Sequence, residues 1–363
     1  MRSKYNNPVS TPITESDLQF QTRMLMRVSR TFALTIPQLP EPLSTVVGNA
    51  YLWCRIADTI EDCPEFSLEE KGAHVASLIA VIGGEQSPGE FAEPLLPGLN
   101  GSEWAGEREL IADTATVMRI FDTFGDRERA AVQQCVRVMA KGMEHFQEGM
   151  FSHGLDDQAH LDTYCYYVAG VVGEMLTEIF CAHSPDIEAN RADLQRLGIS
   201  FGQGLQMTNI LKDIWDDKDR YVCWLPQAAF AEHGFDLHDL MPGQASTEFE
   251  TALGEQIGIA TGHLRNALNY TLLIPASERG IRLFCLWAIG MAVLTLRKIN
   301  NHRGFQSGDE VKISRNAVRV TIFLTRIASS NNSLLRGLFQ AAALSLPRVE
   351  ITPPSAEAPS LAD

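Results

Sequence analysis

Apolar residues recur at helical spacing through most of the 363-residue chain, and this pattern constrains the fold more than any other feature. Residues 43–62 carry apolar side chains three and four positions apart, and Pro64 then marks a natural stop. The same spacing predicts helices over roughly 161–181, 190–217, 248–272 and 279–301. Strand-like alternation is scarce, and its one serious candidate, residues 311–323, fits a helix equally well. We therefore expect an all-α fold.

Three stretches interrupt the helical pattern. Residues 83–104 and 238–246 contain Gly and Pro at positions that indicate surface connections between helices. The segment after Pro347 has three further prolines and a composition typical of disorder. No change of composition separates two domains. We therefore expect a single domain over residues 19–346, between a flexible N-terminal segment (1–18) and a disordered tail (347–363).

Charge and cysteine content exclude some classes of protein. With 45 acidic and 30 basic side chains the formal charge is −15, which argues against a broad nucleic-acid surface. An anionic substrate remains compatible, because a few local cations or bound metal ions can hold one. The seven cysteines form no CxxC pair, and such a scattered, odd set indicates reduced thiols in a cytoplasmic protein.

Membrane signals are weak. The N-terminal segment has no apolar core of the kind found in signal peptides. The most apolar run, residues 283–296, lies between Arg282 and Arg297 and falls short of the roughly 20 residues that span a bilayer. A buried helix is the better interpretation. We expect a cytoplasmic protein whose contact with membranes, if any, is peripheral and transient.

Two acidic clusters on predicted helices carry the strongest chemical signal. Each has members at positions i, i+3 and i+4: Asp58, Glu61 and Asp62 in the first, and Asp213, Asp216 and Asp217 in the second. Side chains at these spacings share one helix face, so the carboxylates can converge. Oxygen ligands in this pattern suit Mg²⁺, which is usually held by a few carboxylates and substrate phosphates. Two such helices facing one another could clamp a diphosphate through bridging ions.

A solvated helix face in an acidic protein explains either cluster alone about as well. Two matching clusters beside apolar residues favour a site, because carboxylates on an apolar face are costly without a partner or metal. Arg55, Lys212 and Arg220 lie near the clusters, and their plain alternative role is ion pairing along the helix. Gln206 and Asn209 precede the second cluster by two turns and one turn. Either side chain could orient a diphosphate or complete a buried polar network.

These motifs resemble the head-to-head isoprenoid synthases, the family of squalene, dehydrosqualene and phytoene synthases. SRTFALTIP (29–37) resembles the family's flap near the substrate, and YCYYVAGVVGE (164–174) its central helix. FGQGLQMTNILKDIWDD (201–217) resembles its second aspartate helix. The blocks follow the family order and span about residues 20–345. The resemblance implies a class I isoprenoid synthase bundle around a central apolar channel, with a monomer as the default state.

Within the family, the last third of the chain discriminates. Residues 282–302 followed by 311–318 resemble squalene synthase, since the other branches are usually shorter here and lack the Lys-containing segment. This implies condensation of two farnesyl diphosphates to presqualene diphosphate, followed by NADPH-dependent reduction to squalene. The alternatives are a dehydrosqualene or phytoene-type synthase without NADPH, and a non-catalytic helical assembly protein. Intact acid clusters argue against the last of these.

The resemblance also assigns roles to residues. Mg²⁺ would bind Asp58, Glu61, Asp62, Asp213 and Asp217. Substrate would contact Ser29, Arg30, Tyr51, Arg55, Gln206, Asn209, Lys212, Arg220 and Phe284. NADPH would contact Arg30, Arg55, Lys312 and Arg315, although the family's Lys-Ile-Arg here has Ser314 in third place, with Arg315 displaced by one position.

Aromatic and glycine residues complete the prediction. Tyr51, Tyr164 and Phe284 align with aromatic pocket positions of the family, where ring faces can stabilise a carbocation. Tyr164 is the candidate for directing proton loss when the cyclopropane forms, whereas Tyr51 and Phe284 fit core packing equally well. The glycines of residues 198–204 follow no strand and make no dinucleotide fingerprint. We interpret them first as points of close helix packing, so NADPH binding depends on the resemblance alone.

Overall fold

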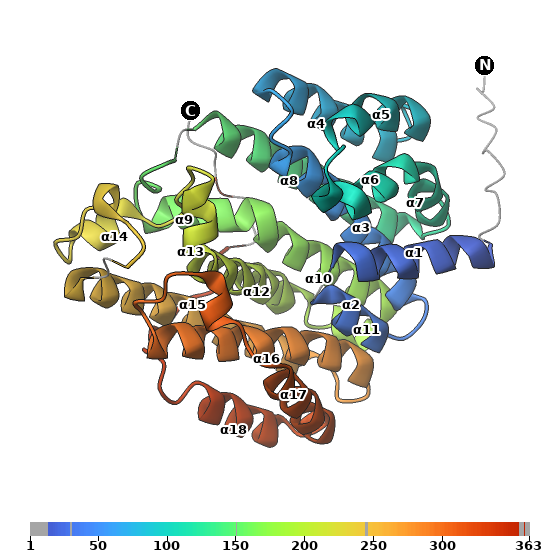
Figure 1. The fold of residues 1–363 in the computed structure, drawn as a ribbon. Helices are drawn as coiled ribbons and strands as arrows, with labels where there is room; N and C mark the ends of the chain where they lie inside the picture. The colour runs from blue at the N-terminus through green and yellow to red at the C-terminus, as the bar shows by residue number, and fades with distance from the viewer. Residues whose placement is uncertain (1–13, 30, 150, 244–245, 356–358, 360–363) are drawn as a thin grey trace, which may run out of the picture. The chain divides into compact units, whose positions relative to one another are not determined.

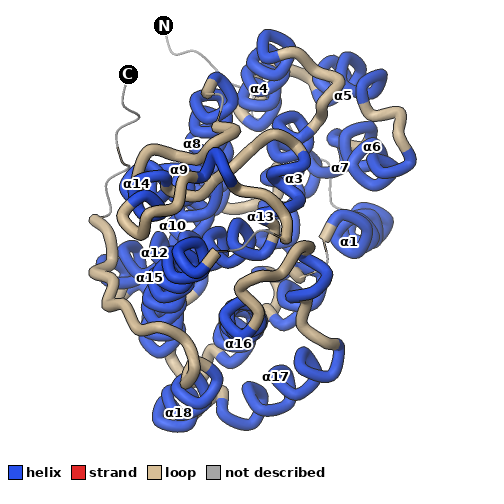
Figure 2. Tube along the Cα trace, turned by 60° about the vertical axis from the view of Figure 1, so that its left-hand side comes forward, coloured by secondary structure: helices blue, strands red, loops and turns tan. Residues whose placement is uncertain are grey.

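The structure, a computed structural model, describes residues 14–29, 31–149, 151–243, 246–355 and 359. Within these ranges the regular structure is helical and there is no β-strand, only one isolated bridge between Leu155 and Pro226 (Figure 2). The all-α prediction is confirmed. All seven cysteines are buried and free of disulfides, as expected.

The chain divides into two compact units, whereas its composition predicts one domain. Unit 1 comprises Met1–Ile36 and Glu41–Arg137, and unit 2 comprises Pro37–Pro40 and Val138–Asp363. The main boundary falls within a continuous helix, α8 (Asp126–Glu148). Composition does not change along this helix, so the sequence has no linker signal there.

Unit 1 is built around α3 (Leu43–Asp62), whose bounds match the prediction. Trp53, Leu52 and Ile56 on this helix are fully buried. Its other helices are α1 (Glu15–Val28), α2 (Phe32–Thr35), α4 (Leu68–Ile82), α5 (Pro88–Leu95), α6 (Ala105–Ala112), α7 (Thr114–Phe121) and the first half of α8, with 3₁₀ turns at Leu96–Gly98 and Ser102–Trp104 (Figure 1). α3 contacts α1, α4, α6 and α7.

The first helix begins earlier than predicted. Thr14 caps α1: its hydroxyl accepts from the backbone N–H of Asp17 at 3.2 Å, and the Asp17 carboxylate accepts from the Thr14 N–H at 3.0 Å. This capping box satisfies backbone donors that a helix start otherwise leaves unpaired. Residues 14–18, which lie in the segment predicted to be flexible, therefore form the cap and first turn of α1, and residues 1–13 lie outside the described ranges.

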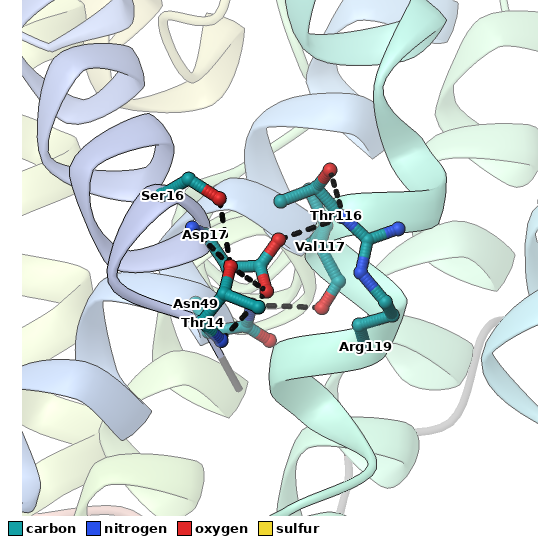
Figure 3. A network of polar contacts seen from close by, with 7 residues as sticks. All are labelled: Thr14, Ser16, Asp17, Asn49, Thr116, Val117 and Arg119. Atoms are coloured by element: carbon teal, nitrogen blue, oxygen red, sulfur yellow. Dashed lines mark hydrogen bonds and ion pairs between the residues drawn. The ribbon is translucent and has the colours of Figure 1, made fainter. Parts of the chain in front are cut away.

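A polar network then ties α1, α3 and α7 together (Figure 3). The Arg119 guanidinium donates to Asp17 at 2.7 Å and to the Thr116 hydroxyl at 2.8 Å, and the Asn49 amide donates to the Val117 carbonyl at 3.0 Å. Burial alone would raise the pKa of Asp17, but hydrogen bonds from Arg119 and from residue 14 outweigh it and lower the pKa. The buried carboxylate thus stays charged and paired.

Residues 83–104 are not the simple surface excursion that their composition predicts. Ser87 caps α5, with Pro88 at its first turn, where the missing N–H costs nothing. Phe91, Leu95 and Leu99 are fully buried. The prolines and glycines here start and end short helices that cover the core of unit 1.

Unit 2 packs its longest helices against one another. It contains α9 (Gln158–Cys165), α10 (Val171–His183), α11 (Pro185–Glu188), α12 (Arg191–Lys212), α13 (Ile214–Asp219), α14 (Gln227–Ala231), α15 (Thr247–Leu273), α16 (Arg279–Asn301), α17 (Arg315–Ala328) and α18 (Asn332–Ala342). Three short turns complete it: Tyr166–Gly170, Leu237–Asp239 and Gly308–Val311. α12 contacts α10, α15 and α16 and is the centre of the unit (Figure 1).

Glycines set the distance between these helices. A Cβ on Gly173 of α10 would lie 1.9 Å from the Gly198 carbonyl oxygen of α12. A Cβ on Gly202 would lie 2.1 Å from the Ala169 carbonyl oxygen. Such distances leave no room for a side chain, so backbone packs on backbone. The interpretation of this glycine run as a close-packing surface is confirmed.

The chain after Pro347 is ordered as far as residue 355, in contrast to the predicted disorder. Val349 and Ile351 pack over Gly258 and Gly262 of α15. The Asn266 amide donates to the Ile351 carbonyl at 2.9 Å. Prolines prevent a helix here, but the extended backbone gains hydrogen bonds from α15 side chains and apolar cover for its glycines. Residues 356–358 and 360–363 lie outside the described ranges.

Two helical stretches are long and apolar enough to cross a membrane by length and composition, Gln158–His183 and Arg279–Asn301. Their most apolar windows are 56% and 72% buried inside the structure. Apolar side chains on both therefore pack against neighbouring helices, as expected for the run 283–296.

One buried histidine at the α12–α15 contact predicts a pH effect on stability. His263 Nδ1 lies 2.8 Å from the Ser200 hydroxyl, and burial lowers the pKa of His263 to about 4. The unfolded chain binds this proton near pH 6.5, so its contribution is complete above that pH and is lost as the pH falls towards 4. We expect a loss of about 3 kcal/mol in the free energy of unfolding over this window. Urea unfolding of His263→Gln should show a flatter pH slope.

The exposed His302→Gln is the matched control, because its imidazole lies at the surface. It should keep the slope of the parent protein. Equal slopes for His263→Gln and the parent would contradict the prediction.

Candidate active site

The second acidic cluster spans a break between two helices, where the sequence predicts one helix over 190–217. α12 ends at Lys212 and α13 begins at Ile214, because Asp213 leaves the helical region with φ −101° and ψ 15°. Asp213 pairs with Lys212 at 2.8 Å. The Asp213 carboxylate is therefore partly exposed at a helix junction and does not lie along a continuous face.

Asp217 is the buried member of this cluster. Arg220 donates to its carboxylate at 2.6 Å. Burial raises the pKa of Asp217 to about 6, with the charges of Asp213 and Asp216 adding to the rise and Arg220 opposing it. Carboxylates that are crowded together and poorly hydrated repel one another, and a bound cation would lower the free-energy cost of keeping them charged. Trp215, which lies between Asp213 and Asp217 in sequence, is buried, and its indole N–H donates to the Phe305 carbonyl.

The segment 305–312 lies against this cluster, which the sequence does not predict. A Cβ on Gly308 would lie 3.3 Å from Asp213 Oδ1 and 3.5 Å from Asp216 Oδ2. Lys312, four residues later, pairs with Asp309, and its carbonyl accepts from Lys298 at 2.6 Å. Unit 2 therefore brings the candidate nucleotide segment next to the second acidic cluster.

Ser314 stands where the family's Lys-Ile-Arg pattern has Arg, and the structure gives a reason for the serine. Its hydroxyl accepts from the Ala317 backbone N–H at 3.1 Å and caps α17. Serine is among the best residues for this position, since it satisfies an unpaired helix donor. Arg315 is then the first residue of α17 and is exposed. The ambiguous stretch 311–323 is thus a loop followed by helix.

Tyr164 lies in an aromatic cluster beside a local change of helix type. Its ring stacks on Trp224 with centroids 3.9 Å apart and meets Phe146 edge-on at 5.1 Å. Immediately after it, residues Tyr166–Gly170 form a π-helical turn between α9 and α10, where one helix over 161–181 was predicted. Such turns are common at functional sites. Trp224 and Phe146 carried no signal in the sequence that linked them to Tyr164.

The first acidic cluster occupies the last turns of α3 in unit 1. Asp58 is 39% exposed and lies 3.9 Å from Arg55. Loss of hydration raises the pKa of Asp58 to about 7; Arg55 opposes this, and the charge of Asp62 adds to it. Glu61 is half-buried, and its carbonyl accepts from Lys71.

Arg55 has a partner that the sequence does not indicate. Its guanidinium donates to Glu107 of α6 at 2.7 Å. Burial disfavours the charged form of Arg55, but Glu107 and Asp58 outweigh it and raise the pKa. Glu107 lies 52 positions away in the sequence, so no spacing rule could have paired the two.

The flap segment is only partly described. The Tyr51 hydroxyl donates to the Val28 carbonyl at 3.0 Å, and its ring packs at 5.3 Å from Phe32. Ser29 accepts from the Phe32 backbone N–H at 3.0 Å. Arg30 lies outside the described residues. Tyr51 therefore holds the junction between α1 and α2 within unit 1.

The remaining candidates lie within unit 2. Phe284 is buried and packs edge-on against Phe180 at 6.2 Å, which satisfies its core-packing interpretation. Gln206 is half-buried and Asn209 is exposed. Both precede Asp213 in sequence and lie on α12, and the Asp213 backbone N–H donates to the Asn209 carbonyl at 2.9 Å.

No group of three or more His, Cys, Asp and Glu side chains among the described residues is placed to hold one metal ion. The members of the first cluster spread over about 100° of the helix circumference at 3.6 residues per turn, and the second is broken at Asp213. Mg²⁺ commonly takes only one or two carboxylates from the protein and completes its shell with phosphates and water. The described carboxylates do not by themselves make up a metal site.

Comparison with known proteins places the chain. Residues 25–317 match the family described as squalene/phytoene synthase.

The chain belongs to this family.

A squalene synthase of Gibberella zeae is 27% identical over 291 residues, which cover 79% of this chain and 60% of the relative. Human squalene synthase is 26% identical over 82% of this chain and 67% of its own length.

A solved structure of TcSQS with the ligand BPH1237 has the same fold, with a TM-score of 0.73, 23% identity and coverage of 91% of both chains. The chain spans less than two thirds of the length of the Gibberella zeae relative. Both acidic clusters, Asp58 to Asp62 and Asp213 to Asp217, fall within the matched range 25–317.

Proposed function

We propose that this chain is a squalene synthase. It would join two molecules of farnesyl diphosphate head to head into presqualene diphosphate, with release of one diphosphate. A reductive rearrangement would then consume NADPH and a proton and release squalene, the second diphosphate and NADP⁺. The observation that carries the proposal is the presence of both acidic clusters within a family match shared with proteins named squalene synthase.

Mg²⁺ would bind at each acidic cluster through Asp58, Glu61 and Asp62 in unit 1 and through Asp213 and Asp217 in unit 2. The raised pKa values of Asp58 and Asp217 support this, because poorly hydrated carboxylates gain most from a cation. When bound, the ions would neutralise the charge that grows on the leaving diphosphate.

The basic side chains near the clusters would bind the diphosphate. Lys212 and Arg220 already pair with cluster carboxylates, and Arg55 lies between Glu107 and Asp58. These contacts support the assignment, because each cation lies beside a carboxylate that would bind the metal ion. Ser29, Arg30, Gln206 and Asn209 are further candidates for this contact.

Tyr164 would act on the carbocation in the first half-reaction. Its ring is buried and stacked on Trp224, so its position is set before substrate binds. Aromatic faces stabilise a cation without forming a bond to it. Its hydroxyl would direct the proton that leaves C1 of one farnesyl group as the cyclopropane closes. Tyr51 and Phe284 would line the apolar channel, which stays a prediction.

NADPH would supply the reducing electron pair in the second half-reaction. Lys312 and Arg315, with Arg30 and Arg55, are the candidates for its phosphates. The position of Gly308 against the second cluster supports the assignment for Lys312. It brings this segment next to the carboxylates that would bind Mg²⁺, and the ions would in turn bind the diphosphate. The monomeric state and the cytoplasmic location also stay predictions.

Product analysis tests the proposal. Purified protein would be incubated with farnesyl diphosphate and Mg²⁺, with and without NADPH, and the extracted products separated by gas chromatography and mass spectrometry. We expect squalene only with NADPH, and presqualene diphosphate or dehydrosqualene without it. A product that does not change with NADPH would assign the chain to the dehydrosqualene branch.

Geranylgeranyl diphosphate serves as the second substrate in the same assay. Turnover of this substrate in preference to farnesyl diphosphate would favour a phytoene-type enzyme. No product from either would favour a non-catalytic protein of the same fold.

A further inference from the structure

The helix α17 exposes a row of apolar residues, and only Thr325 and Ala328 on it are buried. Val320, Phe323, Leu324 and Ile327 follow the spacing i, i+3, i+4 and i+7, which places them on one face. Val320, Phe323 and Ile327 are 55%, 63% and 64% exposed. A surface helix normally turns its apolar face to the core. This helix does the reverse.

The inner face of α17 is held firmly by α16. Thr325 and Ala328 are buried, and Thr321 lies where a Cβ on Gly290 of α16 would be. At the C-terminal end, the buried Arg282 of α16 donates to the Ser329 carbonyl at 2.7 Å. These contacts fix the rotation of α17 about its axis. The outward apolar face is therefore a stable property of unit 2.

The charge around this face is entirely basic. Residues 312–348 contain six basic residues and no acidic residue, in a chain whose formal charge is −15. They are Lys312, Arg315, Arg319, Arg326, Arg336 and Arg348. Arg326 lies over the Trp287 ring at 5.2 Å, and Arg319 is exposed beside Val320. The segment is thus locally cationic on an acidic protein.

The neighbouring helix α18 extends the apolar surface. Leu334 and Leu344 are 53% and 74% exposed. α17 and α18 contact one another and α16, and Figures 1 and 2 both show the pair at the edge of unit 2. α17, α18 and the residues just after α18 thus expose apolar side chains, with basic residues among them in sequence.

We propose that α17 and the start of α18 form a docking surface for an anionic lipid bilayer. An exposed row of Phe, Ile, Val and Leu with basic residues and no acidic ones is the pattern of helices that lie in the membrane interface. The apolar side chains enter the boundary between headgroups and acyl chains, and the arginines contact lipid phosphates. A protein partner with an acidic, apolar groove is the competing occupant. The bilayer fits better because the basic residues are spread over the whole segment 312–348, and a layer of lipid phosphates can meet spread charges without a matching pattern of partners.

Vesicle binding can be measured without turnover, so this test is separate from the test of the proposed function. The full chain would be mixed with phosphatidylcholine vesicles, with or without phosphatidylglycerol, and bound protein measured by flotation. We expect binding to the anionic vesicles that weakens as salt is added, and little binding to phosphatidylcholine alone.

Variants separate the apolar contribution to vesicle binding from the electrostatic one. The double variant Phe323→Ser with Ile327→Ser should weaken binding at least tenfold, because both side chains leave the interface. Arg319→Glu should weaken it by more than the roughly fivefold expected for loss of one positive charge near an anionic surface. All three positions are exposed, so thermal unfolding should be unchanged.

The matched control replaces two apolar residues of similar exposure elsewhere, Leu68→Ser with Met241→Ser. It should bind vesicles as the parent does. Equal loss in this control, undiminished binding of the Phe323 and Ile327 variant, or no binding by the parent would overturn the proposal. A dimer in sedimentation that the Phe323 and Ile327 variant converts to monomer, without vesicle binding, would assign the face to a second copy of the chain.

Discussion

Replacing Asp213 with Asn should lower kcat by about 10²–10³-fold and leave the fold intact. The change keeps the shape of the side chain and removes the negative charge that would hold Mg²⁺. Asp213 is partly exposed and pairs with its neighbour Lys212, and such surface pairs contribute about 0–1 kcal/mol. Asp58→Asn should behave alike, since its partner Arg55 keeps its contact with Glu107. Squalene formation at saturating farnesyl diphosphate measures the effect, and circular dichroism checks the fold.

Asp219→Asn is the matched control for this experiment. It makes the same change of charge on α13, at an exposed residue outside the predicted ligand set. Its rate should stay close to that of the parent. A normal rate for Asp213→Asn or Asp58→Asn would remove that residue from the catalytic role, and a large effect in Asp219→Asn would indicate an unspecific effect of charge.

Replacing Gly173 with Ala should destabilise unit 2 by about 3 kcal/mol or more. The added methyl group would lie 1.9 Å from the Gly198 carbonyl oxygen, and neither backbone can move without shifting α10 or α12. Added volume in a packed core usually costs about 1–3 kcal/mol, and here the obstacle is backbone and not a flexible side chain. Urea unfolding followed by circular dichroism measures the change.

Gly337→Ala in the middle of α18 is the control, because nothing lies within 4 Å of the added Cβ. There the same substitution should stabilise the protein by about 0.5–1 kcal/mol, since alanine is the better helix former. If both variants lower stability equally, or neither does, the close contact of α10 with α12 does not determine the cost.

Several elements follow directly from local sequence. The bounds of α3 and α16 agree with the apolar periodicity, because both helices pack one or more long faces into a core and end at clear signals. The acidic clusters are visible for a similar reason, since the residue types and their spacing are local properties. The packing role of the glycines at 198–204 could be inferred because their helix has no strand before it.

Other features depend on residues far apart in the chain. The helix break at Asp213 lies where Gly308 and Phe305 approach α13. The apolar periodicity of the sequence continues through residue 213, so it gives no indication of the break. The ordered segment 349–351 has a composition typical of disorder, and its order comes from hydrogen bonds with α15 side chains and from packing over two glycines of α15. The composition of residues 83–104 is typical of a loop, because the short helices there have several Gly and Pro residues at their ends.

The sequence by itself determined the all-α class, the family and the candidate metal ligands, because periodicity and motif spacing are read along the chain. Only the tertiary structure decided which side chains are paired and which face of a helix is exposed. Arg55 meets Glu107, Tyr164 stacks on Trp224, and α17 turns Phe323 and Ile327 outward. These contacts join residues tens of positions apart, and their free energy comes from burial and charge in the folded state, which no local pattern records.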